Sequence, residues 1–179
     1  MGVGWPAVAP ADNLTAVRLE SERLVLEPLR PEHADELAPV LDDVALHRFI
    51  GGEPLGLEDL RARFARQARG RSPDGRAWWL NWVVRERATH GPIGTVQATV
   101  SASETDPTAE LAWVIASPDQ GRGFAKEATA LVATWLRTRG VSRLRAHIHP
   151  QHEASMAVAR SVGMAPTEVV VDGEIRWES

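Results

Sequence analysis

The chain contains no cysteine and no tyrosine, and Lys126 is its only lysine. The absence of cysteine excludes disulfides, thiolate metal sites and cysteine nucleophiles. The absence of tyrosine removes the phenol as a catalytic acid or base, and Schiff-base chemistry would depend on the single lysine. No apolar run is long enough to span a bilayer, and the N-terminus lacks the basic start and apolar core of a signal peptide. These absences predict a soluble cytoplasmic protein with no membrane partner.

The composition is typical of one globular domain. The chain has 179 residues, of which 44% are hydrophobic and 25% are charged, and such a chain can bury a substantial core. Its formal net charge of −4 gives no indication of a nucleic-acid-binding surface. We expect an N-terminal tail or arm at residues 1–17 and a single domain at residues 18–179.

The pattern of apolar residues predicts an alternation of strands and helices. Helices are predicted to begin near residue 31 and to occupy residues 57–69, 124–139 and 153–162, the last two ending at glycines. Strands are predicted at residues 23–29, 79–85, 93–100, 109–115 and 143–148. Asp172-Gly173 predicts a two-residue hairpin turn between strands at residues 168–171 and 174–177. The predicted order of elements is β-α-α-β-β-β-α-β-α-β-β.

The most informative segment joins the strand at residues 109–115 to the helix that follows. Gln120-Gly121-Arg122-Gly123-Phe124-Ala125 forms a glycine-bearing loop directly before the helix. Glycines let the backbone approach an anion closely. The first N–H groups of a helix lack internal partners, and the helix dipole favours negative charge at that end. The loop therefore predicts a ligand that bears a pyrophosphate.

Three phosphate-binding signatures distinguish the classes of ligand. The Walker A pattern is absent. The dinucleotide fingerprint begins at Gly121 and Gly123, but Lys126 stands where its third small residue belongs; a nicotinamide-cofactor enzyme is kept as an alternative. The third pattern, [QR]-x-x-G-x-[GA], is satisfied by Gln120, Gly123 and Ala125.

On these residues the chain resembles the GNAT acetyltransferase superfamily, and its wider segment at residues 110–128 resembles the RimJ/RimL-type branch. The resemblance extends from about residue 23 to residue 177. It implies an α/β (α+β), single-domain GNAT-like fold, with a mixed, mostly antiparallel central sheet, about four flanking helices and a C-terminal β-hairpin. It implies an N-acetyltransferase that moves an acetyl or other acyl group from acetyl-CoA to a primary amine by direct attack in a ternary complex. The acceptor would be a protein N-terminal amine or a small amine, and a homodimer is left open.

The same resemblance implies which residues hold the coenzyme. They lie in the strand edge, the loop and the start of a later helix: Trp113, Val114, Ile115, Gln120, Gly121, Arg122, Gly123, Phe124, Ala125, Lys126 and His152. His152 stands where the branch usually has asparagine, and an imidazole reproduces the amide contact only in one tautomer. His147, His149 and His152 suggest a metal site, but no acid lies at a convincing ligand spacing, so we expect no metal.

Two residues are candidates for acid–base chemistry. Ser155 matches a serine of the branch and would protonate the thiolate leaving group in place of tyrosine; alternatively, its hydroxyl caps the helix. Glu110 would accept the amine's proton through water; alternatively, it is a solvated acid at a strand end. The missing tyrosine and the substituted asparagine also allow a non-catalytic acyl-CoA-binding module.

The resemblance places the acceptor pocket between the first two helices, the central strands and the hairpin. It implicates His47, Phe49, Trp79 and Trp82, with Arg48 and Trp78 beside them. Tryptophans could form the wall of a pocket for an apolar or cationic amine. The alternative is that most of them pack in the core.

Overall fold

The computed structural model describes residues 14–101 and 107–179 and contains one eight-stranded sheet. The strands lie in the order β1-β2-β3-β4-β5-β6-β8-β7, and only β5 and β6 are parallel neighbours. The sheet is therefore mixed and mostly antiparallel, as predicted. Its strands are β1 (Leu19–Glu20), β2 (Leu24–Pro28), β3 (Ala77–Glu86), β4 (Pro92–Ser101), β5 (Thr108–Ile115), β6 (Arg143–Ile148), β7 (Ala165–Val171) and β8 (Glu174–Glu178).

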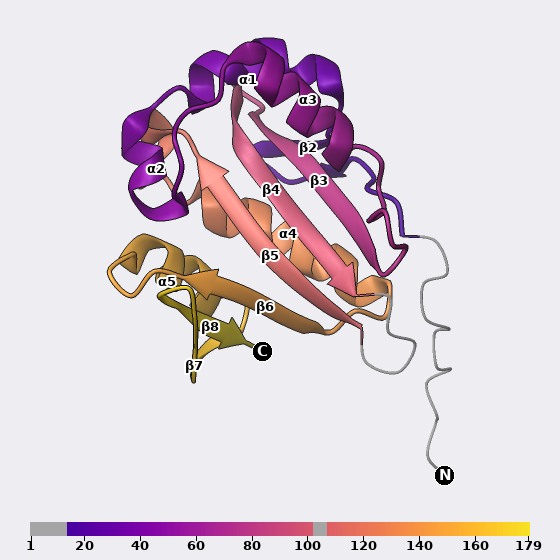
Figure 1. Ribbon diagram of the computed structural model, residues 1–179, viewed down its shortest axis with the longest axis vertical. Helices are drawn as coiled ribbons and strands as arrows, with labels where there is room; N and C mark the ends of the chain where they lie inside the picture. Colours follow the sequence, from indigo (N-terminus) through magenta and orange to yellow (C-terminus); the bar gives the residue numbers. More distant parts are fainter. Residues whose placement is uncertain (1–13, 102–106) are drawn as a thin grey trace.

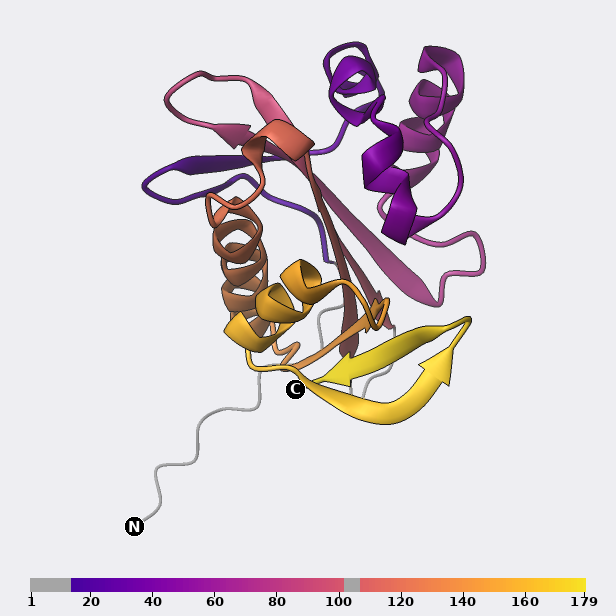
Figure 2. The ribbon, with the colours of Figure 1, turned by 90° about the vertical axis from the view of Figure 1, so that its left-hand side faces the viewer.

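Helices cover both faces of the sheet (Figure 2). On one face lie α1 (Ala34–Leu41), α2 (Val44–Ile50) and α3 (Leu57–Gln67), and on the other lie α4 (Phe124–Thr138) and α5 (Glu153–Ser161). The 3-10 turns η1 (Pro31–His33) and η2 (Ser117–Asp119) precede α1 and α4. The alternation of side chains along each strand divides the apolar residues between these two faces.

The larger core lies between the sheet and α4 and α5. Leu80 and Trp82 of β3 pack there with Val132 of α4, whereas Val83 packs on the opposite face with Phe64 of α3. The register carries this division across the sheet, because residues opposite one another in neighbouring strands share a face. The face that carries α1, α2 and α3 is called the acceptor face below.

Strands β5 and β6 pair only at one end. Their parallel register covers Thr108–Glu110, and beyond these residues the two strands separate (Figure 1). Strand β5 therefore keeps one edge free of β6 from Leu111 to Ile115, while its other edge stays paired with β4. A strand edge that ends at a helix N-terminus can present peptide groups and an anion site to the same ligand.

Every element expected from the sequence is present, with ends shifted by a few residues. Two elements were not predicted: the two-residue strand β1 and the helix α2, which brings the number of α-helices in the described residues to five. The hairpin prediction is confirmed, since Asp172 and Gly173 have φ of 51° and 85°, as a type I′ turn requires. Within the described residues no helix is both long and apolar enough to cross a membrane.

Part of the predicted N-terminal arm packs on the domain. Leu14 is buried in the larger core, and the carbonyl of Val17 accepts a 2.7 Å hydrogen bond from the Trp82 indole. Residues 1–13 of the arm lie outside the described residues. The boundary between residues 17 and 18 stays a prediction.

Candidate active site

The loop before α4 has the backbone geometry of an anion site. Gly121 and Gly123 have φ of 76° and 82°, values that favour glycine, and α4 begins at Phe124. No side chain caps this helix, and no hydrogen bond from the N–H groups of residues 121–125 forms within the described part of the chain. The loop therefore presents free N–H groups at the positive end of the helix dipole.

Gln120 anchors this loop to the end of β5. Its side-chain Nε2 donates a 2.9 Å hydrogen bond to the carbonyl of Ile115, and its backbone N–H donates to the carbonyl of Ser117. The N–H of Gln120 is thus already used, which differs from the expectation that it holds the phosphate. Gln120 instead fixes the positions of Gly121 and Gly123 by attaching the loop to β5.

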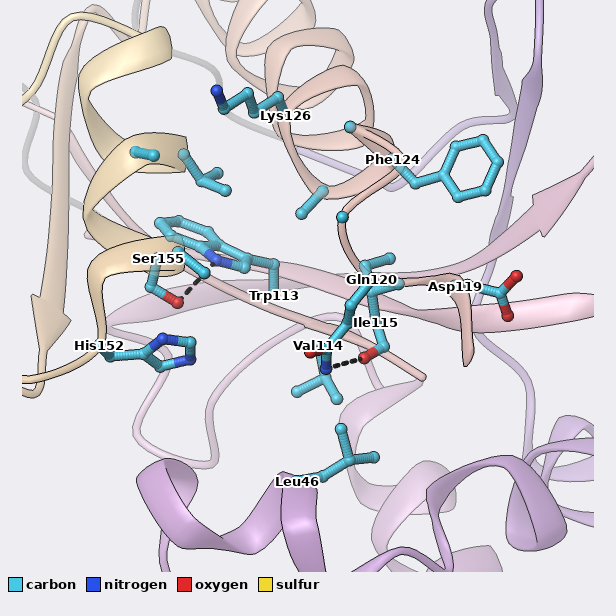
Figure 3. A pocket seen from close by; sticks show the side chains of 16 residues that line it. Leu46, Trp113, Val114, Ile115, Asp119, Gln120, Phe124, Lys126, His152 and Ser155 are labelled. Carbon is cyan, nitrogen blue, oxygen red and sulfur yellow. Dashed lines mark hydrogen bonds between the residues drawn. The ribbon is translucent and has the colours of Figure 1, made fainter. Parts of the chain in front are cut away.

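The two basic residues of the loop have different surroundings. Arg122 donates to Asp119 at 2.9 Å and to the buried carboxylate of Glu86 at 2.5 Å, so its charge is already balanced by protein groups. Lys126 is exposed at the cavity and has no ion-pair partner among the described residues. In Figure 3 it extends from α4 toward α5, whereas the ring of Phe124 turns away from the cavity. Lys126 is therefore the better placed cation for a phosphate.

A cavity of about 280 Å³ connects the loop, the open edge of β5 and α5 (Figure 3). At its centre the indole N–H of Trp113 donates a 3.3 Å hydrogen bond to the hydroxyl oxygen of Ser155. This bond uses an acceptor site of the hydroxyl and leaves its proton free to be donated. The capping alternative for Ser155 finds no support, because the N-cap of α5 is His152 and no side chain caps that helix.

The hydrogen-bond pattern shows which peptide groups face the gap between β5 and β6. The N–H of Ala116 donates to Ile93, so the alternation of an antiparallel pair turns Val114 toward β4 and Trp113 and Ile115 toward the gap. The Ile115 carbonyl accepts a hydrogen bond from the Gln120 side chain, while the backbone N–H and C=O of Trp113 face the opening. Val114 contributes its side chain to the cavity.

His152 lines the cavity and also holds α2 in place. Its ring stacks on Phe49 with a centroid separation of 4.3 Å and an interplanar angle of 26°. Burial, and then the nearby His149, lower the pKa of His152 below its ordinary value. The neutral ring is therefore the form that suits this contact.

Helix α2 bridges the two sides of the opening. Its N-cap Asp43 accepts a hydrogen bond from Ser117 at the end of β5, while Phe49 near its other end contacts His152 at the start of α5. Leu46, between them, is buried. Leu46 of this helix lies between the first cavity and a second cavity on the acceptor face and lines both.

The contact between α2 and α5 predicts a pH dependence. Because the pKa of His152 is depressed in the folded protein, its contribution to stability is complete above its unfolded value of about 6.5 and is lost as pH falls toward the folded value. We expect the free energy of unfolding to fall less between pH 7.5 and pH 5.5 in His152→Asn than in the wild type. Urea titrations at several pH values would measure this, and equal slopes would contradict it. His33, whose pKa is also lowered by burial, is common to both proteins.

The second cavity, of about 400 Å³, adjoins the first through Leu46, Trp113 and Val114. Among the predicted acceptor residues, His47 and Trp82 line it. The indole of Trp82 nevertheless has 0% exposure, packs edge-on against Trp135 in the larger core and donates to Val17.

The other aromatic residues assigned to the acceptor pocket have separate positions. Phe49 contacts His149 and His152, with the Arg48 guanidinium 5.2 Å from its ring centroid. Trp79 lies on the acceptor face, and Trp78 packs against the larger core. None of these three side chains is part of the lining of the second cavity within the described residues.

Glu110 lies on the acceptor face where β5 and β6 begin to separate. Its side chain is 51% exposed, and its Oε1 is 3.1 Å from Nδ1 of His147. The register places it two residues before Ala112, which lines the second cavity. Among the described residues no three histidine, cysteine or acidic side chains form a group that could hold a metal ion.

Sequence reasoning missed the polar residues that lie beside the second cavity. Asn81, Gln97 and Gln67 line it, from β3, β4 and α3. The alternation of β4, with Thr95, Gln97 and Thr99 between apolar residues, was the available signal. This alternation indicated that one face of β4 is polar, but it did not indicate that this face lines a cavity.

These features together define a protein with a phosphate-binding loop, an open strand edge and an adjoining second cavity. The chain belongs to the acetyltransferase (GNAT) domain family, whose model matches residues 23–165.

Solved structures share this fold over most of their length. A protein from Bordetella pertussis assigned to the GNAT family is 25% identical, with a TM-score of 0.67, over 90% of this chain and 98% of its own. A structure assigned as a ribosomal-protein-serine acetyltransferase from Vibrio cholerae is 20% identical, with a TM-score of 0.69, covering 91% and 97%. The aminoglycoside acetyltransferase AAC(6')-Ib is 15% identical, with a TM-score of 0.71, covering 87% and 94%.

Proposed function

We propose that this protein transfers an acyl group, in the simplest case acetyl, from coenzyme A to a primary amine. The observation that carries the proposal is the hydrogen bond between Trp113 and Ser155 inside a cavity that also contains the free N–H groups of the loop. The AAC(6')-Ib neighbour was solved with coenzyme A. The mostly antiparallel sheet does not have the parallel, doubly wound topology that a nicotinamide-cofactor enzyme of this kind would need.

The residues of the chain fit the parts of a coenzyme A thioester. The N–H groups of residues 121–125 and the Lys126 ammonium suit the phosphates. The exposed peptide groups of Trp113 suit an amide-bearing arm that extends the edge of β5. We assign His152 to the wall of this channel, since its ring is stacked on Phe49.

The reaction needs one proton removed and one supplied. The amine nitrogen attacks the thioester carbonyl, the C–S bond breaks, and the Ser155 hydroxyl gives its proton to the departing sulfur. The amine's own proton passes to Glu110 through water, and solvent returns a proton to Ser155. His147 orients the Glu110 carboxylate at 3.1 Å.

Release of free thiol from acetyl-CoA, measured over a panel of amines and peptide N-termini, tests this proposal. We expect turnover with at least one amine, and a roughly tenfold or greater loss of kcat in Glu110→Gln. Tight binding of acetyl-CoA without turnover of any amine would favour the non-catalytic alternative. N-terminal peptide acceptors preferred over all small amines would support assignment to the RimJ/RimL-type branch.

A further inference from the structure

The floor of the second cavity is built from uncharged hydrogen-bonding groups. The register sets Gln97 of β4 between Asn81 of β3 and Ala112 of β5 on the acceptor face. Gln67 of α3 donates to Gln97 at 3.4 Å and accepts at its backbone carbonyl from Asn81 at 3.3 Å. These bonds fix the side-chain amides, and within the described residues no other hydrogen bond uses the side-chain Oδ1 of Asn81 or the side-chain Nε2 of Gln97. The floor is therefore suited to a neutral polar group of the acceptor.

The charged groups on the rim of this cavity are few and of both signs. Arg63 of α3, Glu53 of the preceding loop and His47 of α2 line it. Neither Arg63 nor Glu53 forms an ion pair within the described residues, although Asp59 lies one turn before Arg63 on the same helix. The neighbouring Arg61, by contrast, is paired with Asp35 and Glu58. The cavity thus offers one guanidinium and one carboxylate without an ion pair among the described residues, and it lacks the cluster of carboxylates that would hold several ammonium groups.

We propose that the acceptor is an amine that also carries a carboxylate, such as an amino acid or a short peptide, and that Arg63 binds this carboxylate. The inference rests on the proposed acyltransferase function and names its substrate class. A guanidinium binds a carboxylate through two parallel hydrogen bonds, a geometry that an ammonium or an amide does not provide. Glu110 lies on the same face of the sheet, and it is the residue that we propose to accept the amine's proton. A polycation such as spermidine would be repelled by Arg63, and the cavity has too few carboxylates to balance its positive charges.

Matched acceptor pairs test the proposal. Free amino acids and dipeptides would be assayed against their C-terminal amides, with spermidine as the polycation. We expect kcat/KM for the best carboxylate-bearing acceptor to exceed that for its amide about tenfold, as a charge-assisted hydrogen bond to an exposed arginine allows. In Arg63→Gln the ratio should fall to near one, mainly through a loss of kcat/KM for the carboxylate-bearing acceptor. Arg63→Lys should recover only part of the ratio.

Arg66→Gln is the matched control, because Arg66 lies on the same helix outside the lining of the cavity. It should keep the wild-type ratio. Equal rates for acids and amides in the wild type, or preferred turnover of spermidine, would overturn the substrate class and leave acyl transfer intact. Absence of thiol release with every acceptor would instead be a failure of the proposed acyltransferase function.

Discussion

Ser155→Ala should lower kcat about 100-fold while the affinity for coenzyme A stays within about twofold of the wild type. The loss lies at the low end of the range for general acid catalysis, because water in the cavity can take over part of the role. The structure motivates the expectation, since the Trp113 indole donates to the Ser155 oxygen and so directs the hydroxyl proton elsewhere. Steady-state kinetics by thiol release, together with calorimetric binding of coenzyme A, would separate the two effects.

A matched control lies on the same helix. Ser161 also carries a hydroxyl on α5, but it donates to the carbonyl of Val158 and does not line the cavity. Ser161→Ala should therefore leave kcat unchanged. Trp113→Phe removes the indole N–H while it keeps an aromatic ring, and we expect a smaller fall in kcat than in Ser155→Ala. Full activity of Ser155→Ala would show that another group, or solvent, protonates the sulfur.

The loop between β5 and α4 could be predicted because its signals are local in the sequence. The glycines of the loop, the apolar strand before it and the helix after it are contiguous, and each has a conformational preference that the sequence shows directly. Ser155 was predicted because it matches a serine of the RimJ/RimL-type branch. The structure adds what the sequence could not contain, namely its contact with Trp113, which is 42 residues earlier in the chain.

The lining of the second cavity was harder to predict because it depends on how distant elements meet. Helix α2 has only 7 residues, and it is held by Asp43–Ser117 and Phe49–His152 contacts that span the sheet opening. Trp82 could not be assigned to a face of the sheet from the sequence. The alternation of residues along β3 separates two opposite faces, but it does not show which of the two faces packs against α4. The separation of β5 from β6 likewise has no signature in the sequence of either strand.

Arg122 illustrates the same limit for electrostatics. Its place in the loop suggested a phosphate contact or a solvated side chain. The structure pairs it instead with Glu86, which is 36 residues away at the end of β3, and with Asp119. Arg122 thus fixes the loop, and Lys126 is the residue that we propose to contact the phosphates.

The opening between β5 and β6 also depends on a contact on the other side of β5. Gly94 of β4 lies opposite Ile115, and a Cβ atom added to it would be 2.0 Å from the carbonyl oxygen of Val114 and 3.0 Å from the Cα of Ile115. Both neighbours are backbone atoms, so no side-chain rotation can relieve the overlap. Any side chain at this position must push β5 away from β4 at the residues that line both cavities.

We therefore expect Gly94→Ala to destabilise the protein by about 3 kcal/mol, the upper part of the range for overpacked positions. In whatever fraction remains folded, binding of coenzyme A should be weakened, because Trp113 and Gln120 are positioned by the same end of β5. Urea unfolding and coenzyme titration would measure the two effects. Gly91→Ala is the control, since a Cβ there would meet only Thr89 Oγ1 at an ordinary 3.5 Å. A wild-type unfolding midpoint in Gly94→Ala would mean that β5 can move without loss, and the opening would then be set by β6 alone.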